Sequence, residues 1–258
     1  RVDLATLAPT GKGGRIRECD VLAASTKPTP ASMREVSITT MRRTIATRMV
    51  NSLNNTAPVT LTCRCDATQL VTLREQLKAA GASRVPSYTD IIAKISASAL
   101  ITHPLLTARW DRERLLMPEH IHIGIAVDTD AGLLVPVLRD VSTSSLTAIA
   151  SQSCQLIEVA RAGRLIAADM QGGCFTITNL GSFGIEGFTP IINYPETAIL
   201  GLGAIIREPV ALEDGTLTSR QQMTLSLTFD HRILDGAPAA RFLQTLRQRI
   251  ESPVAWLI

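Results

Sequence analysis

Hydrophobic residues recur at helical spacing in five stretches of the chain, and in seven shorter stretches they either alternate with polar residues or form a continuous apolar run. The first pattern places apolar side chains on one face of a helix, and both kinds of shorter stretch are typical of strands. The helical stretches end where glycine or proline interrupts them. The predicted helices are 41–53, 67–80, 88–102, 144–163 and 237–250, and the predicted strands are 58–66, 105–110, 121–128, 133–138, 174–179, 197–206 and 221–229.

Two helix boundaries have a local chemical signal. Ser87 lies three residues before Asp90, which resembles a capping box with aspartate in the place of glutamate. Pro104 follows the same helical stretch and should terminate it. The mixed order of helices and strands predicts an α/β layered fold, with helices packed against a mixed sheet.

The chain is expected to contain one large domain and a small appendage. Residues 25–34 contain two prolines among small polar residues, which is typical of an extended linker. Residues 1–24 are too few to bury a core of their own. We therefore expect three parts: a fragment at 1–24, a linker at 25–34 and a main domain at 35–258.

Composition excludes several classes of protein. The net charge of +3 comes from 26 basic and 23 acidic residues, without the basic runs interleaved with aromatics that follow nucleic acid. No apolar run approaches the roughly 20 residues of a membrane span. Five cysteines without a CxxC pair fit a reducing compartment better than a disulfide framework.

Two pairs of residues have the spacing that would place both side chains on one strand face, where they could bind a metal ion. These pairs are Cys63 with Cys65 and His120 with His122. Neither has a second ligand pair nearby in the sequence, so no metal site is predicted.

The most informative motif is Asp-His-Arg-Ile-Leu-Asp-Gly at 230–236. It places the imidazole of His231 just after a predicted strand and the carboxylate of Asp235 four residues later, before a new helix. A histidine at a strand end beside a turn is typical of a reaction site. The alternative, a purely structural role, would bury several ionisable groups side by side at a cost of several kcal/mol.

Four motifs in order resemble the catalytic domain of the dihydrolipoamide acyltransferases, the core components of 2-oxo acid dehydrogenase complexes. They are 122–129, 132–137, 175–181 and 230–236. The resemblance covers residues 35–258 and implies a fold like that of chloramphenicol acetyltransferase. Residues 1–24 resemble the second half of the peripheral-subunit-binding domain that precedes this catalytic domain, so the chain is expected to be a fragment that lacks the lipoyl domain.

The resemblance implies an exchange of an acyl group between dihydrolipoamide and coenzyme A, with no metal. His231 would be the general base, because an imidazole with an ordinary pKa of about 6.5 can accept a proton from a thiol of about 8.5. Thr178 would donate to the oxyanion, and Asp235 would organise the histidine through a salt bridge. Arg232 could supply the pairing charge of that bridge or could equally be structural, so it is not counted among the catalytic residues. Cys174 is interpreted as buried packing.

The resemblance also implies homotrimers with active sites between subunits, assembled into cubes of 24 or shells of 60 subunits. His231 and Asp235 would come from one chain and Thr178 from its neighbour. Lys12 and Arg15 match basic positions that grip the dihydrolipoamide dehydrogenase or 2-oxo acid decarboxylase partner. The truncated binding domain is expected to bind such a partner weakly or not at all. A bacterial protein of this kind would be cytoplasmic, and a eukaryotic one would lie in the mitochondrial matrix.

Two other functions remain open from the sequence. A structural core protein would keep the fold without catalysis, although the presence of both His231 and Asp235 argues against it. A small-molecule O-acetyltransferase of the chloramphenicol type shares the same spacing. Residues 236–242 resemble acetyl-transferring members of the family, which favours acetyl and the pyruvate dehydrogenase complex. Val59 stands where many relatives have a histidine, so no substrate contact is assigned there.

Overall fold

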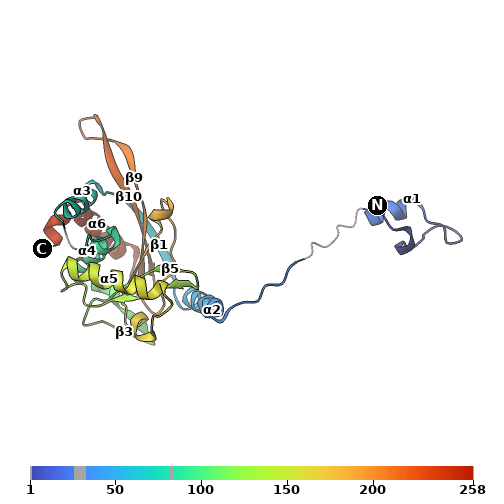
Figure 1. Cartoon of the computed structure of the whole chain (residues 1–258), viewed down its shortest axis with the longest axis horizontal. Coiled ribbons are helices and arrows are strands. Elements are labelled where there is room, and N and C mark those ends of the chain that lie inside the picture. Colours follow the sequence, from blue (N-terminus) through green and yellow to red (C-terminus); the bar gives the residue numbers. More distant parts are fainter. Residues whose placement is uncertain (1, 26–32, 82–83, 258) are drawn as a thin grey trace. The chain divides into compact units, whose positions relative to one another are not determined.

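The computed structural model describes residues 2–25, 33–81 and 84–257. The chain divides into two compact units, one ending at Ile38 and the other beginning at Thr39 (Figure 1). Most of the predicted linker at 25–34 lies outside the described residues, so that assignment stays a prediction. The sheet and its covering helices belong to the second unit.

The first unit is organised around one carboxylate. It contains the short helical turn η1 (Leu4–Thr6) and the helix α1 (Glu18–Ser25). The carboxylate of Asp20 accepts hydrogen bonds from the backbone nitrogens of Arg17 and Thr10 and from the Thr10 hydroxyl. The bond from Arg17, followed by those from Thr10, lowers the pKa of Asp20 to about 2. Asp20 thus fixes the loop that carries Lys12 and Arg15.

Six strands of the second unit form one mixed sheet in the order β1-β10-β9-β8-β4-β7. The first three are antiparallel neighbours, β8 runs parallel to both β9 and β4, and β7 is antiparallel to β4. Two hairpins, β2–β3 and β5–β6, stand apart from this sheet. The strands are β1 (Pro58–Asp66), β2 (Arg109–Asp111), β3 (Arg114–Leu116), β4 (Ile123–Ile125), β5 (Val127–Thr129), β6 (Gly132–Leu134), β7 (Val137–Leu138), β8 (Phe175–Asn179), β9 (Ala198–Ala211) and β10 (Leu217–Asp230).

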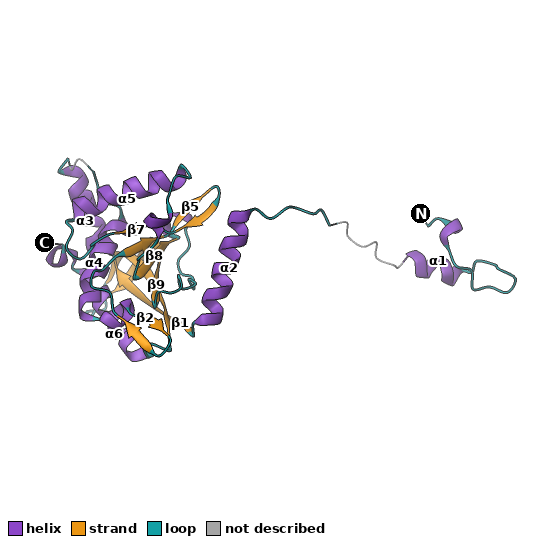
Figure 2. Ribbon diagram, turned by 90° about the horizontal axis from the view of Figure 1, so that it is seen from below, coloured by secondary structure: helices purple, strands orange, loops and turns teal. Residues whose placement is uncertain are grey.

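Helices cover the sheet unequally. Four of them gather on one face, where α6 packs against α3, α4 and β1, and α5 packs against α4. The helix α2 lies on the other side of the sheet (Figure 2). No helix in the described parts of the chain is long and apolar enough to cross a bilayer. The helices are α2 (Thr40–Asn55), α3 (Thr68–Ala79), α4 (Tyr88–Thr102), α5 (Leu146–Arg161) and α6 (Gly236–Glu251), with shorter turns η2 (Pro104–Thr107), η3 (Ala167–Met170), η4 (Gly181–Phe183) and η5 (Pro253–Trp256).

The core lies between the sheet and α4 and α6, and its composition follows from strand alternation. Phe229 and Phe175 point toward the helices, and the ring of Phe175 meets that of Phe242 edge-on at 5.9 Å. The intervening positions of β10 face the other way. There Thr228 is also buried and its hydroxyl lies 2.7 Å from that of Thr60. The sheet therefore has one aliphatic and aromatic face and one face lined with hydroxyls.

The predicted α/β class with a mixed sheet is confirmed, and so are most of its elements. All five predicted helices are present, with ends that differ by a few residues, and β1 has the predicted bounds. Ser87 accepts from the backbone of Asp90, and Asp90 accepts from the backbone of Ser87, which completes the predicted capping box.

Three strand predictions were wrong in detail. Residues 105–110 were predicted as one strand, but Pro104 starts the turn η2, closed by the Thr107 hydroxyl bonding to the Pro104 carbonyl, before the short strand β2. The predicted strands at 121–128 and 133–138 are each divided in two. Ala126 and Pro136 mark the breaks, because there the chain leaves the large sheet to form the hairpin β5–β6.

The hairpin of β9 and β10 extends beyond the predicted strands. The pairing continues to Ala211 and Leu217, where many side chains are exposed and hydrophobic alternation no longer marks the strands. Backbone hydrogen bonds rather than burial sustain this extension. The short strand β3 was not predicted, because its three residues are exposed.

Gly203 in β9 permits a close backbone approach that any side chain would prevent. A Cβ atom at this position would lie 1.9 Å from the carbonyl oxygen of Glu186 and 3.2 Å from that of Thr224. The loop after β8 therefore packs directly on the strand at this point.

Substitution Gly203→Ala should consequently destabilise the protein by about 3 kcal/mol, the upper part of the usual range for overpacking. Thermal unfolding would measure this loss. Gly236→Ala is the matched control, because a Cβ atom there meets no atom within 4 Å. Equal thermal midpoints for the two variants would contradict the prediction.

Candidate active site

The predicted base, His231, directly follows the last residue of β10. Its backbone nitrogen donates to the carbonyl of Ala57 at 2.8 Å, just before β1, so the main chain is held between two segments. Its ring lies 5.8 Å from that of Phe229, which is in the core. The side chain is still 43% exposed. The backbone of His231 is thus held in place, while its imidazole is accessible to a substrate.

Asp235 lies beside this imidazole. It is the residue before α6, and its Oδ1 is 3.7 Å from Nδ1 of His231. Its side chain is 84% exposed, and an ion pair as exposed as this contributes little to stability. The arrangement can therefore orient the ring without being a major support of the fold.

Thr178, the predicted oxyanion donor, is far from His231 within one chain. It lies on β8 opposite Gly201 of β9, which in turn lies opposite Ser226 of β10. His231 is five residues beyond Ser226, so the two sites are separated by about 17 Å along the strands and two strand spacings across them. The structure brings His231 and Asp235 together and leaves Thr178 apart.

The surroundings of Thr178 are on the hydroxyl-lined face of the sheet. Thr178 is half-buried, and a Cβ atom at its neighbour Gly201 would lie 3.0 Å from the ring of Phe188. The segment between β8 and β9 thus crosses this face near Thr178.

A buried carboxylate on the same face was not predicted from the sequence. Glu196 is 4% exposed, and its two oxygens accept hydrogen bonds from the hydroxyl of Thr176 and the amide of Asn193. Burial raises the pKa of Glu196 to about 7, although these hydrogen bonds act in the opposite direction. The only sequence signal was a glutamate directly before an apolar strand.

This raised pKa predicts a pH-dependent stability. A carboxyl whose folded pKa exceeds its unfolded value of 4.5 contributes stability that is fully present below pH 4.5 and is lost as the pH rises through about 7. The difference corresponds to about 3 kcal/mol. Glu196→Gln should therefore raise the thermal midpoint relative to wild type much more at pH 8 than at pH 5.

The exposed Glu113 gives the control for this experiment, because Glu113→Gln should leave the difference between the two pH values unchanged. If Glu196→Gln shifted the midpoint equally at pH 5 and pH 8, Glu196 would not be the titrating group.

Arg232 pairs with the carboxylate of Asp230 and not with that of Asp235, for which the family resemblance implies a salt bridge. Its guanidinium pairs with Asp230, the buried residue that ends β10, with Nη2 at 2.6 Å from Oδ2. Burial raises the pKa of Asp230, but the hydrogen bonds from Arg232 and Ala57 outweigh this and hold it below its ordinary value. Asp230 therefore remains ionised next to His231.

Cys174, His120 and His122 each contact a neighbouring group of the protein. Cys174 is buried, its thiol donates to the carbonyl of His122, and burial raises its pKa to about 11, so it is a poor nucleophile at neutral pH. The rings of His120 and His122 stack at 6.0 Å, and their Nδ1 atoms lie 3.3 and 3.9 Å from Oδ1 of Asp140.

Within residues 2–25, 33–81 and 84–257, no three histidine, cysteine or acidic side chains are placed to hold a metal ion. Cys63 and Cys65, considered in the sequence as metal ligands, both have raised thiol pKa values, caused mainly by burial.

The predicted partner-binding residues lie in the first unit. Lys12 and Arg15 are exposed in the loop before α1, which closes by a hydrogen bond from the nitrogen of Gly11 to the carbonyl of Arg15. Their role in binding stays a prediction.

The chain is similar to known proteins over almost its whole length. A family model, described as the catalytic domain of the 2-oxoacid dehydrogenases acyltransferase, matches residues 30–258. The acetyltransferase component of the acetoin cleaving system of Bacillus subtilis is 40% identical over 100% of this chain and 67% of its own length. The dihydrolipoyllysine-residue acetyltransferase component of the pyruvate dehydrogenase complex of Corynebacterium glutamicum is 37% identical over 97% of this chain and 42% of its own length.

Two solved structures share the fold of the second unit. One is the dihydrolipoamide acetyltransferase of Azotobacter vinelandii, studied for the catalytic role of a serine, a histidine and an asparagine, and the other is the cubic core of a pyruvate dehydrogenase multienzyme complex. Each has a TM-score of 0.84 and 36% identity, and the match covers 88% of this chain and 95% of the solved chain. By sequence and by fold, the chain belongs to the family of 2-oxoacid dehydrogenase acyltransferase catalytic domains.

Proposed function

We propose that this chain transfers an acetyl group between the dihydrolipoyl thiol of a lipoyl domain and coenzyme A. One observation carries the proposal: an accessible imidazole, His231, lies 3.7 Å from the carboxylate of Asp235 in a member of this acyltransferase family. The relatives described above are named acetyltransferases, which favours acetyl over larger acyl groups.

The reaction is a thioester exchange, and His231 supplies its proton transfer. The imidazole removes the proton of the coenzyme A thiol, and the thiolate attacks the carbonyl carbon of the acetyl-lipoyl thioester. The tetrahedral intermediate then expels the dihydrolipoyl sulfur, which receives the proton from His231. Asp235 lies near Nδ1, so Nε2 is the nitrogen assigned to the thiol. No acyl-enzyme is formed, and the buried Cys174 takes no part.

The oxyanion of that intermediate needs a hydrogen-bond donor, and Thr178 is assigned this role from a neighbouring subunit. Its separation from His231 within one chain excludes a direct contact there. In a trimer, the hydroxyl-lined face of one subunit meets the His231 loop of the next, which completes the site. The cubic core formed by the solved relative supports assembly of this kind.

Residue spacing in the Azotobacter vinelandii relative supports the same assignment. Its histidine and asparagine are four residues apart, as are His231 and Asp235, and its serine lies 52 residues before the histidine, against 53 between Thr178 and His231. The position of the asparagine is occupied by Asp235 here. An anionic side chain at this position adds a charge beside the imidazole.

The first unit is proposed to contribute to the wider complex. Its exposed Lys12 and Arg15 would contact dihydrolipoamide dehydrogenase or the 2-oxo acid decarboxylase in a longer protein. The chain spans between 42% and 67% of the two curated relatives, so their remaining parts have no counterpart in this sequence. Residues 1–24 resemble only the second half of the binding domain, so these two residues alone are expected to bind weakly or not at all. Calorimetric titration of this chain with either partner should therefore show no association in the micromolar range, and micromolar or tighter binding would contradict this.

The proposal is tested by measuring which acyl-coenzyme A serves as the donor and which molecule serves as the acceptor. Acyl transfer from acetyl-, succinyl- and isobutyryl-coenzyme A to dihydrolipoamide should show a preference for acetyl of at least about tenfold, the usual discrimination for added methylenes. Chloramphenicol serves as the competing acceptor. Transfer to chloramphenicol but not to dihydrolipoamide would identify a small-molecule O-acetyltransferase, and no transfer by an assembled core would identify a structural protein.

A further inference from the structure

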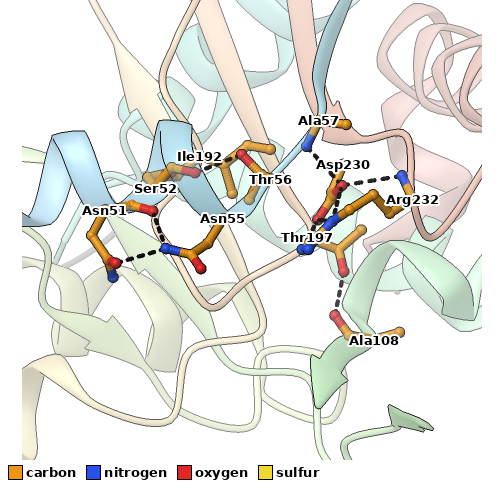
Figure 3. A network of polar contacts seen from close by, with 10 residues as sticks. All are labelled: Asn51, Ser52, Asn55, Thr56, Ala57, Ala108, Ile192, Thr197, Asp230 and Arg232. Carbon is orange, nitrogen blue, oxygen red and sulfur yellow. Dashed lines mark hydrogen bonds and ion pairs between the residues drawn. The ribbon is translucent and has the colours of Figure 1, made fainter. Parts of the chain in front are cut away.

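The buried carboxylate of Asp230, the residue before His231, accepts hydrogen bonds from Ala57 and Arg232. Figure 3 shows these contacts. Asp230 is 1% exposed and ends β10. Its Oδ1 accepts from the backbone nitrogen of Ala57 at 3.0 Å, the backbone nitrogen of Arg232 at 3.1 Å and Nε of Arg232 at 3.0 Å. Its Oδ2 accepts from Nε and Nη2 of Arg232 at 3.0 and 2.6 Å. Both oxygens of this carboxylate therefore accept hydrogen bonds, and all of these bonds come from Ala57 and Arg232.

These bonds hold the main chain on both sides of His231. Asp230 binds the nitrogen of the residue after the histidine, while its own nitrogen donates to the carbonyl of Thr197 at 2.9 Å. Ala57 contributes twice, because its nitrogen donates to Asp230 and its carbonyl accepts from the nitrogen of His231. Asp230 and His231 are therefore hydrogen-bonded to two neighbouring segments, and Arg232 is hydrogen-bonded back to Asp230, so the main chain is held on both sides of the imidazole.

A second layer of contacts holds Arg232. Its guanidinium lies 5.2 Å from the centre of the Trp110 ring, a distance at which a cation is attracted to the ring face. Two residues before Trp110, the carbonyl of Ala108 accepts the hydroxyl of Thr197 (Figure 3). The start of β2 thus supports both Arg232 and the segment to which Asp230 is bonded.

Contacts in the structure favour the charged forms of both Asp230 and Arg232. Burial alone would favour the neutral carboxyl, but Arg232 and Ala57 lower the pKa of Asp230, and Asp230 in turn raises the pKa of Arg232. The Arg232 side chain is only 34% exposed, so solvent competes weakly for the pair. A two-pronged guanidinium–carboxylate contact also has a fixed geometry, which a lysine cannot reproduce.

We propose that Asp230 and Arg232 are positioning residues that set the orientation of the His231 imidazole for proton transfer. Neither side chain is assigned contact with the substrate; both act through the backbone that bears the histidine. This inference rests on the proposed role of His231 as the general base. A misplacement of a catalytic group by about 1 Å can lower the rate about a hundredfold, so a device that fixes the ring affects turnover directly.

The test compares Asp230→Asn, Arg232→Gln and Arg232→Lys in the assembled core. The first two should lower kcat roughly ten- to a hundredfold while leaving the KM for acetyl-coenzyme A within about twofold, because substrate binding does not involve the pair. Arg232→Lys should recover part of the activity lost in Arg232→Gln. If the pair only stabilised the fold, its loss would not lower kcat selectively while leaving KM unchanged.

The matched control is Arg64→Gln. Arg64 makes the same kind of contact with Glu208, with Nη2 at 2.7 Å from both carboxylate oxygens. Arg64 lies opposite Thr224 of β10, so this contact is far along the strands from His231. Its loss should leave kcat unchanged. If Asp230→Asn does not fold, Arg232→Lys carries the test, since it retains the positive charge and loses only the two-pronged geometry.

Wild-type kcat in a folded Asp230→Asn or Arg232→Lys core would overturn the inference. His231→Ala, assayed in parallel, separates this failure from that of the proposed function. An inactive His231→Ala with fully active Asp230→Asn would refute only the positioning role, whereas an active His231→Ala would refute the role of the base itself.

Discussion

Replacing His231 by alanine should lower kcat for acetyl transfer to dihydrolipoamide by at least about a hundredfold, the low end of the contribution of a general base. The imidazole is the group beside Asp235 that can accept the thiol proton, and it is accessible at the end of β10. Without it, the thiol of coenzyme A must lose its proton to water. The KM for acetyl-coenzyme A should change little, because the imidazole is assigned to the chemical step.

His120→Ala provides the control for this variant. His120 is exposed and lies near Asp140, on the segment before β4, so its loss should not affect the rate. Both proteins should be compared after sedimentation analysis shows the same assembly. A His231→Ala core with more than a tenth of the wild-type kcat would contradict the assignment of the base.

Replacing Thr178 by alanine should lower kcat by about a hundredfold, as expected for removal of one oxyanion donor. In the proposed mechanism, the hydroxyl stabilises the negative charge that develops on the carbonyl oxygen of the thioester in the transition state, a charge that the bound substrate does not yet carry. The effect should therefore appear in kcat rather than in KM.

Thr178→Ser separates the hydroxyl from the rest of the side chain. Serine keeps the donor and should retain most of the activity, while valine keeps the shape, lacks the donor and should behave like alanine. If Thr178→Ala and Thr178→Ser had equal rates, the threonine would be an ordinary strand residue rather than the oxyanion donor.

Much of the fold could be predicted because its elements carry local signals. The capping box at Ser87 and the alternation over β1 are properties of short segments, and both are present as predicted. Residues 105–110 were mispredicted because their apolar character suits a strand, whereas Pro104 and the hydroxyl of Thr107 favour a turn. The outer part of the β9–β10 hairpin carries no hydrophobic pattern, since its pairing rests on the backbone.

In the candidate site, too, local spacing could be read from the sequence, whereas contacts between distant segments could not. His231 and Asp235 could be identified together because their four-residue spacing brings them within 3.7 Å. Asp230 and Glu196 were not assigned roles, because the burial of a carboxylate depends on which distant segments cover it: Ala57 and Arg232 bind the first, and Thr176 and Asn193 bind the second. The distance between Thr178 and His231 is likewise set by strand order, which local patterns do not encode.

The central claim is that each active site is shared between two subunits, and mixing two inactive variants tests it most directly. His231→Ala and Thr178→Ala chains, given different tags, are co-expressed in equal amounts and purified over both tags. Native mass spectrometry of the dissociated core then shows whether trimers contain both chains. If one subunit provides His231 and its neighbour Thr178, random mixing leaves both residues intact at about a quarter of the sites, so activity should return to about a quarter of the wild-type value. Mixed trimers no more active than the two separate variants would show that each site lies within one chain.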